Sequence, residues 1–305
     1  MSFLWERMRI MGFTSLPQKP LFGKALKKKL FSCLDRVLPL PEVIIKAQKL
    51  LIDPNSKFEE LANIIETDQE ITLKSLNVAN SAYYSLKNEV RSVRQACVIL
   101  GLKVIAEIVM TAGTATLYDR ALRAYNMSPK DLWRHSLATA LSARKIADAV
   151  RPDMANETFL AGLFHDAGKL ILDEQIFSRK KAFKNFLGDS PKTHYEAEKQ
   201  ILGVDHSEIA AELCRRWKFP LAVTRAIRHH HNINPKQVDD LTYILHAADN
   251  LTKMGGNDNS GGCMPSELDE QVMLFLALTE NDIADIMAEV NQSVSQIGNE
   301  IFGNA

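Results

Sequence analysis

Apolar residues recur along this chain at the spacing of helix faces, and the first half shows little of the period-two alternation typical of strands. From Phe31 to Leu117 the pattern predicts a series of short helices, two of which follow Asp68 and Ser92, residues whose side chains can cap a first turn. Gly101 ends the second of these helices, and an apolar stripe restarts at Leu102. This half is therefore predicted to be all-α.

The periodicity lapses from Arg120 to Ser128 and then resumes in further helical segments. One of them, TFLAGLFHDAGKLIL from Thr158 to Leu172, places the adjacent residues His165 and Asp166 at the end of an apolar run. Burying an imidazole beside a carboxylate costs several kcal/mol unless the two groups hydrogen-bond, pair or coordinate a metal ion. A metal site is the first hypothesis for this pair.

All eight histidines lie between His135 and His246, and the polar residues of five predicted helical segments are expected to converge. Asp131 and His135, for example, are four residues apart and therefore share one helix face. The candidate metal ligands are Asp131, His135, His165, Asp166, His206, His230, His231 and Asp249.

Three consecutive histidines follow the segment LAVTRAIR. Successive residues of a helix diverge by about 100°, so at most two of the three can face one centre. We choose His230 and His231 and expect His229 to be exposed. His194 is interpreted as an ordinary hydrogen-bonded histidine, and His246 either as the same or as a residue that supports the last candidate ligand, one turn further on.

The composition of the chain indicates what class of protein carries these candidate ligands. The 305 residues are 46% hydrophobic and 24% charged, which is typical of a folded soluble chain. With 37 basic and 37 acidic residues there is no net field to attract nucleic acid or an anionic membrane, so no specific nucleic-acid binding is expected. The four cysteines form no CxxC pair, and no uncharged run approaches the roughly 18 residues of a membrane span. A cytoplasmic protein is expected.

The series His135, His165-Asp166 and Asp249 resembles the H…HD…D signature of the HD superfamily of metal-dependent phosphohydrolases, which are all-helical. Longer stretches narrow the resemblance to the HDOD family, the HD-related output domain of bacterial signalling proteins; they include VRSVRQACVILGLKVI, LWRHSLATA, FLAGLFHDAGKL and LGVDHSEIAAELCRRWKFP.

The HDOD resemblance covers residues 33–252 and implies one multi-helix bundle. In it an N-terminal helical half, residues 33–125, packs against an HD-like half with the metal site, residues 126–252. Residues 1–32 are then an N-terminal extension and residues 264–303 a C-terminal helical extension.

The catalytic relatives of this family, the HD-GYP phosphodiesterases of cyclic di-GMP, have metal positions that match the eight candidates, with Glu where this chain has Asp131. HDAGK resembles their HDIGK, which makes Lys169 the counterpart of a contact to the substrate phosphate. In the HD pattern Asp166 is the carboxylate best placed to bridge two ions and hold the attacking water. After His231, however, the chain lacks a GYP element, so hydrolysis of cyclic di-GMP is not expected.

Two functions remain open. The first is a bacterial signalling output module that binds metal, and a partner protein or a nucleotide, without catalysis. The second is a phosphodiesterase or phosphomonoesterase acting on a nucleotide-like substrate, with Asp166 and Lys169 as its catalytic residues. The first is favoured because the resemblance names a family without established turnover. Mixed imidazole and carboxylate ligands suit Fe, Mn, Zn or Ni better than Mg, so one or two divalent transition-metal ions are expected.

The end of the chain predicts one more element. Residues 255–262 have the composition of a flexible linker, and Thr279 can cap the long helix that follows. The apolar stripe of that helix consists of Ile283, Ile286, Met287, Val290, Val294, Ile297 and Ile301. The stripe must be covered, either by the domain itself, which is favoured, or by a partner in a homodimer through residues 283–301.

Overall fold

The computed structural model describes residues 23–52, 65, 68–188, 193–233, 239–256 and 270–303. Within these ranges the chain is all-α, as predicted, and the only extended pairing is an isolated bridge between Leu122 and Met127. Residues 1–22 of the expected N-terminal extension lie outside the described residues. The same holds for residues 257–269, which include most of the expected linker.

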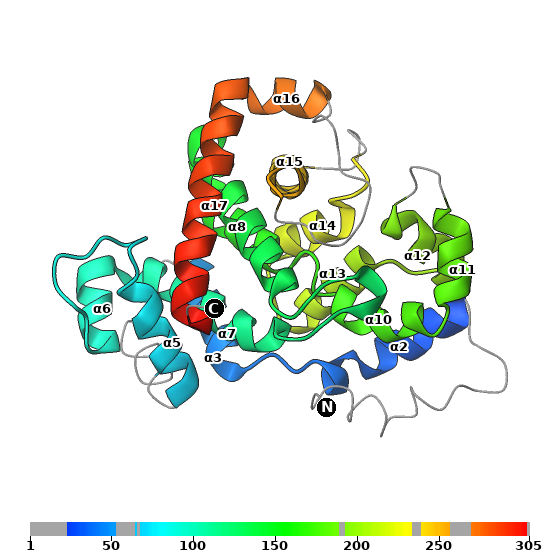
Figure 1. Ribbon diagram of the computed structural model, residues 1–305, viewed down its shortest axis with the longest axis horizontal. Helices are drawn as coiled ribbons and strands as arrows, with labels where there is room; N and C mark the ends of the chain where they lie inside the picture. Colours follow the sequence, from blue (N-terminus) through cyan, green and yellow to red (C-terminus); the bar gives the residue numbers. More distant parts are fainter. Residues whose placement is uncertain are drawn as a thin grey trace.

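The helices follow one another with short connections and no regular layers (Figure 1). They are α2 Gly23–Val37, α3 Glu42–Ile52, α5 Gln69–Ala79, α6 Val93–Leu100, α7 Leu102–Tyr118, α8 Asp131–Val150, α9 Ala155–Phe164, α10 Lys169–Phe177, α11 Lys180–Leu187, α12 His194–Leu202, α13 His206–Arg216, α14 Leu221–His229, α15 Asp240–Met254, α16 Glu270–Leu276 and α17 Glu280–Phe302, with short 3-10 turns η1 Arg123–Tyr125 and η2 Pro152–Met154.

Two helices of the first half begin with the side-chain caps that the sequence predicts. The Asp68 side chain accepts a hydrogen bond from Ile71 N at 3.1 Å, and the Ser92 side chain accepts one from Gln95 N at 3.2 Å. Such a cap stabilises a helix by about 1 kcal/mol. Gly101 separates α6 from α7 with a φ of 84°, a backbone conformation that favours glycine. Both predicted caps and the predicted break are confirmed.

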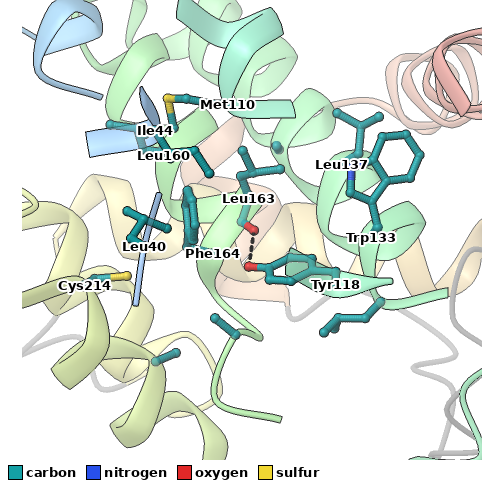
Figure 2. Close-up of a cluster of buried hydrophobic side chains, with 14 of the residues drawn as sticks. Leu40, Ile44, Met110, Tyr118, Trp133, Leu137, Leu160, Leu163, Phe164 and Cys214 are labelled. Atoms are coloured by element: carbon teal, nitrogen blue, oxygen red, sulfur yellow. Dashed lines mark hydrogen bonds between the residues drawn. The ribbon is translucent and has the colours of Figure 1, made fainter. Parts of the chain in front are cut away.

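The two predicted halves share one core. Helix α7 of the first half packs against α3 and α8, and α8 packs against α9, so the apolar residues of both halves belong to one cluster (Figure 2). Inside it the Tyr118 hydroxyl donates to Leu163 O at 3.0 Å, which ties α7 to α9. The lapse at residues 120–128 is a surface turn that is anchored in the core by the fully buried side chains of Leu122 and Tyr125. The bundle is continuous through the expected boundary.

Helix α2 joins that core although two thirds of it belong to the expected extension, residues 1–32. Its residues Leu26, Leu30 and Leu34 are buried, and the helix packs against α12 and α13. An ion pair between Lys27 and Glu208 links α2 to α13. Helix α2 therefore packs against both α12 and α13.

Helix α17 lies against α8 and reaches α5 with its C-terminal part (Figure 1). Thr279 and Asp282 form a reciprocal capping box at its start. The stripe is buried at Val290, Val294, Ile297 and Ile301. Packing on the same domain therefore covers this part of the stripe, and the homodimer through residues 283–301 stays a prediction. Among the described helices, none combines the length and apolar composition that crossing a bilayer requires.

The contact between α8 and α9 gives a test of the packing. A Cβ added at Gly162 would lie 2.5 Å from the Cα atom of Ala140, whereas one at Gly298 would meet only the Trp133 ring at 3.5 Å. Gly162→Ala is expected to lower the free energy of unfolding by about 1–3 kcal/mol through overpacking. Gly298→Ala, inside α17, is expected to be neutral or to stabilise by up to about 1 kcal/mol. Urea unfolding measures both, and equal stabilities would contradict this packing.

Candidate metal centre

Seven of the eight candidate ligands meet in the interior of the HD-like half. His135 lies on α8, His165 and Asp166 occupy the turn between α9 and α10, and Asp249 lies on α15. His206 is the first residue of α13, and His230 and His231 follow α14 directly. Residues more than a hundred positions apart thus converge because α8, α9, α14 and α15 pack against one another.

We call His135, His165, Asp166 and Asp249 the first ligand group; the ligand atoms of Asp249 and His165 also lie within 4.8 Å of one on His230. The Nε2 atoms of His135 and His165 are 3.2 Å apart. Asp166 Oδ2 lies 3.5 Å from His135 Nε2 and 3.4 Å from His165 Nε2. Asp249 Oδ1 lies 3.2 Å from His135 Nε2 and 3.6 Å from His165 Nε2. All four residues are at most 1% exposed.

The second ligand group consists of Asp166, His206, His230 and His231, whose ligand atoms lie within 4.8 Å of one another. The Nε2 atoms of His206 and His231 are 2.8 Å apart, and Asp166 Oδ1 lies 3.2 Å from His206 Nε2. Asp166 thus belongs to both groups, with one oxygen facing each. Asp166 could therefore supply an oxygen ligand to an ion held by either group.

The hydrogen-bond partners of three imidazoles fix which ring nitrogen faces the centre. In each ring Nδ1 lies against an oxygen that can only accept, so Nδ1 carries hydrogen and Nε2 of the neutral ring offers a lone pair. The contacts are His165 Nδ1 to Gly162 O at 2.7 Å, His230 Nδ1 to Ile227 O at 2.6 Å and His206 Nδ1 to Glu198 Oε2 at 2.7 Å.

Several of the inward-facing atoms lack a hydrogen-bond partner among the described residues. They are His230 Nε2, Asp166 Oδ1 and Asp249 Oδ1, and all are buried. Buried polar atoms are ordinarily paired, and a cation held by nitrogen and oxygen lone pairs satisfies them together. The donor set of imidazole nitrogens and carboxylate oxygens therefore fits a divalent transition-metal ion.

Two lysines neutralise the central carboxylates. Burial opposes ionisation of Asp166, but Lys169, with Nζ 2.6 Å from Oδ2, and His165 outweigh it and hold the pKa of Asp166 well below its usual range. Burial likewise opposes ionisation of Asp249, and Lys253, also at 2.6 Å, lowers its pKa in the same way. Lys253 was not among the sequence candidates, although its spacing of four residues from Asp249 on one predicted helix is a readable signal.

The pKa values of three candidate histidines are shifted in different directions. Burial lowers the pKa values of His230 and His231 well below the usual range, so both rings are neutral. Burial also disfavours the charged form of His165, but Asp166 and Asp249 outweigh it and raise its pKa to about 9. Since a metal ion binds the unprotonated nitrogen, binding at His165 displaces a proton.

Asp131 is the one candidate ligand that does not lie with the other seven. Its carboxylate accepts a hydrogen bond from Ser128 N at 2.7 Å at the start of α8, and it belongs to none of the ligand groups. His246 contacts the backbone of His230 rather than Asp249, the ligand that it was considered to support, since its Nδ1 is 2.6 Å from His230 O. His229 is partly exposed rather than fully so, and His194 lies beside the Tyr125 ring.

The close approach of α10 to α13 depends on Gly168. A Cβ at this position would lie 2.0 Å from His206 O, so only glycine lets the HDAGK turn reach the start of α13. That contact brings His206 within reach of Asp166. Glu198 was not among the sequence candidates, because it lies on α12 whereas the histidine that it contacts is the first residue of α13.

The Lys253–Asp249 pair generates a test that needs no metal. Lys253→Met is expected to lower the free energy of unfolding of the chelator-treated protein by about 3 kcal/mol, because it leaves a buried carboxylate without its cation. Lys145→Met removes an exposed pair with Glu289 and is expected to cost less than about 1 kcal/mol. Denaturant unfolding in the presence of chelator compares the two, and equal losses would rule out a buried charge balance at Asp249.

The chain was compared with known families and proteins. The sequence model of the HDOD domain matches residues 37–233, close to the range 33–252 expected from the sequence. Comparison with curated proteins finds no match.

Solved structures share the fold. An HDOD domain protein of unknown function from Geobacter sulfurreducens is 24% identical with a TM-score of 0.68, over 91% of this chain and 97% of that one. A candidate signal-transduction protein from Marinobacter aquaeolei is 22% identical with a TM-score of 0.70, over 91% of this chain and 64% of that one. A candidate metal-dependent phosphohydrolase from Shewanella amazonensis is 19% identical with a TM-score of 0.53, over 88% of this chain and 99% of that one. At these identities the similarity is one of fold.

Proposed function

The chain belongs to the HDOD family, and on that premise we propose that it is a metal-holding regulatory module of a bacterial signalling system. The observation that carries the proposal is the convergence of seven ligand-type side chains, six of them buried, and three imidazoles among them have Nε2 turned inward by an oxygen partner at Nδ1. Such preparation of the lone pairs suits binding of one or two ions.

Enclosure of the ligands favours regulation over turnover. Of the seven residues only His231 is partly exposed, and His135, His165 and His230 have no exposed surface. A phosphoester substrate would have to reach these enclosed side chains, and both central carboxylates already have a lysine partner. Because the ligand atoms are enclosed, a bound metal ion would satisfy polar groups in the interior of the bundle and so stabilise its packing.

A regulatory role follows from how the ligands are distributed. A bound transition-metal ion supplies Lewis acidity and lowers the pKa of a coordinated water. The residues of this chain bring α8, α13, α14 and α15 to that one point, so binding energy is converted into stability of the bundle. We propose that a signalling protein, or a nucleotide, reads the bundle in its metal-bound state.

The alternative is a metal-dependent phosphohydrolase. It is favoured by Lys169, whose ammonium lies beside Asp166 within the ligand groups, and by the similarity in fold to the candidate phosphohydrolase. In that reaction Lys169 would bind an anionic phosphate oxygen and Asp166 would orient the attacking water. The substrate would be a phosphodiester or phosphomonoester of a nucleotide type.

Metal content is the first test of the proposal. The purified protein is expected to carry about one to two equivalents of Fe, Mn, Zn or Ni, because the ligand set is mixed imidazole and carboxylate. Elemental analysis by mass spectrometry measures the content, and removal by a chelator is expected to lower the melting temperature through linkage. Substoichiometric metal after anaerobic purification, with no change on chelation, would reject the metal site.

The Asp166→Asn variant separates the two functions. It keeps the size of the side chain but removes the charge shared by both ligand groups. For a regulatory module, wild-type protein shows no metal-dependent turnover on a phosphodiester and phosphomonoester panel, and the variant loses metal and thermal stability. Robust wild-type hydrolysis that falls by orders of magnitude in Asp166→Asn would replace the regulatory proposal with the hydrolase.

A further inference from the structure

Glu198 is a buried carboxylate with three hydrogen-bond donors and no assigned role. It lies on α12 with no exposed surface. Its Oε1 accepts from the Tyr125 hydroxyl at 2.7 Å, and its Oε2 accepts from both Nδ1 and the backbone N of His206, each at 2.7 Å. Because His206 is the first residue of α13, the carboxylate also lies at the positive end of that helix.

The contact of Glu198 distinguishes His206 from the other inward-facing imidazoles. His165 and His230 place Nδ1 against neutral backbone carbonyls, whereas His206 places it against a carboxylate. A charge-assisted hydrogen bond is stronger than a neutral one and makes the opposite ring nitrogen a better electron-pair donor. Nε2 of His206 is the atom that lies 3.2 Å from Asp166 Oδ1.

We infer that Glu198 is a positioning residue: it holds His206 in the Nδ1–H form and sets the metal affinity of the second ligand group. The inference rests on the proposed metal site but concerns one group within it. The first group shares Asp166 with the second but contains no residue that Glu198 contacts directly, so its affinity is expected to depend much less on this carboxylate. The two groups therefore differ in what controls their occupancy.

A second path of contacts connects Glu198 with the same centre. Tyr125, which donates to Glu198, has the Lys169 ammonium 5.5 Å from its ring centroid, and that ammonium pairs with Asp166. Tyr125 and Glu198 are both fully buried, so neither can turn to solvent. Helix α12 consequently fixes the second group at two of its members, His206 directly and Asp166 through Lys169.

The test replaces Glu198 with Gln, which keeps the shape and one acceptor oxygen but removes the charge. In Zn²⁺ titrations of the metal-free protein, Glu198→Gln is expected to weaken one binding event about 10- to 100-fold and to leave the other within a factor of about three. In ¹⁵N NMR of the metal-free protein, His206 is expected to be protonated at Nδ1 in the wild type and to populate both tautomers in the variant.

Two control variants separate positioning from general destabilisation. Tyr125→Phe removes a buried hydrogen bond to the same carboxylate without touching His206, and it is expected to lower stability while leaving the His206 tautomer unchanged. Glu300→Gln changes an exposed carboxylate on α17 and is expected to change nothing. If Glu198→Gln does not fold, Glu198→Asp carries the test, because it keeps the charge but shortens its reach to Nδ1.

The outcomes are distinct for the inference and for the metal site. Unchanged His206 tautomer and unchanged Zn²⁺ affinities in the Glu198 variant would overturn the inference while leaving the metal site intact. A wild type that binds no Zn²⁺ would reject the metal site, and the tautomer measurement would still decide whether Glu198 positions His206.

Discussion

Two ionised carboxylates buried among histidines are the constraint on which this structure depends. Asp166 and Asp249 are at most 1% exposed. A buried carboxylate keeps its negative charge only if a cation, hydrogen-bond donors or a metal ion compensate it. Lys169 and Lys253 each pair with one of these carboxylates, and both carboxylates also lie against imidazole nitrogens. The packing of α8, α9, α13, α14 and α15 follows from bringing these groups together.

The need to bring these buried charges together accounts for glycines and helix contacts that lie far apart in the sequence. Gly168 has no side chain because α10 must approach the start of α13, and Gly162 has none because α9 lies directly on α8. Helix α2 supports α13 from behind, and α17 closes the outer side of α8. The surrounding helices thus pack directly against the segments that carry the candidate ligands.

Much of this was predictable from the chain. The helical period gave the fold class, the caps at Asp68 and Ser92 gave helix starts, and His165-Asp166 stood out because a charged pair inside an apolar run needs a partner. The contact of Glu198 with His206 was not predictable, since it joins two helices through a geometry that no linear spacing encodes. Asp131 shows the converse: it shares a face with His135, yet its carboxylate accepts a hydrogen bond from Ser128 N at the start of α8.

An anomalous difference map of crystals grown from protein purified without added metal tests the central claim most directly. The account predicts a strong peak enclosed by the Nε2 atoms of His135 and His165 and the carboxylates of Asp166 and Asp249, and a second peak near His206, His230 and His231 when both groups are filled. No peak at either place, with the imidazoles hydrogen-bonded to one another and to water, would contradict it.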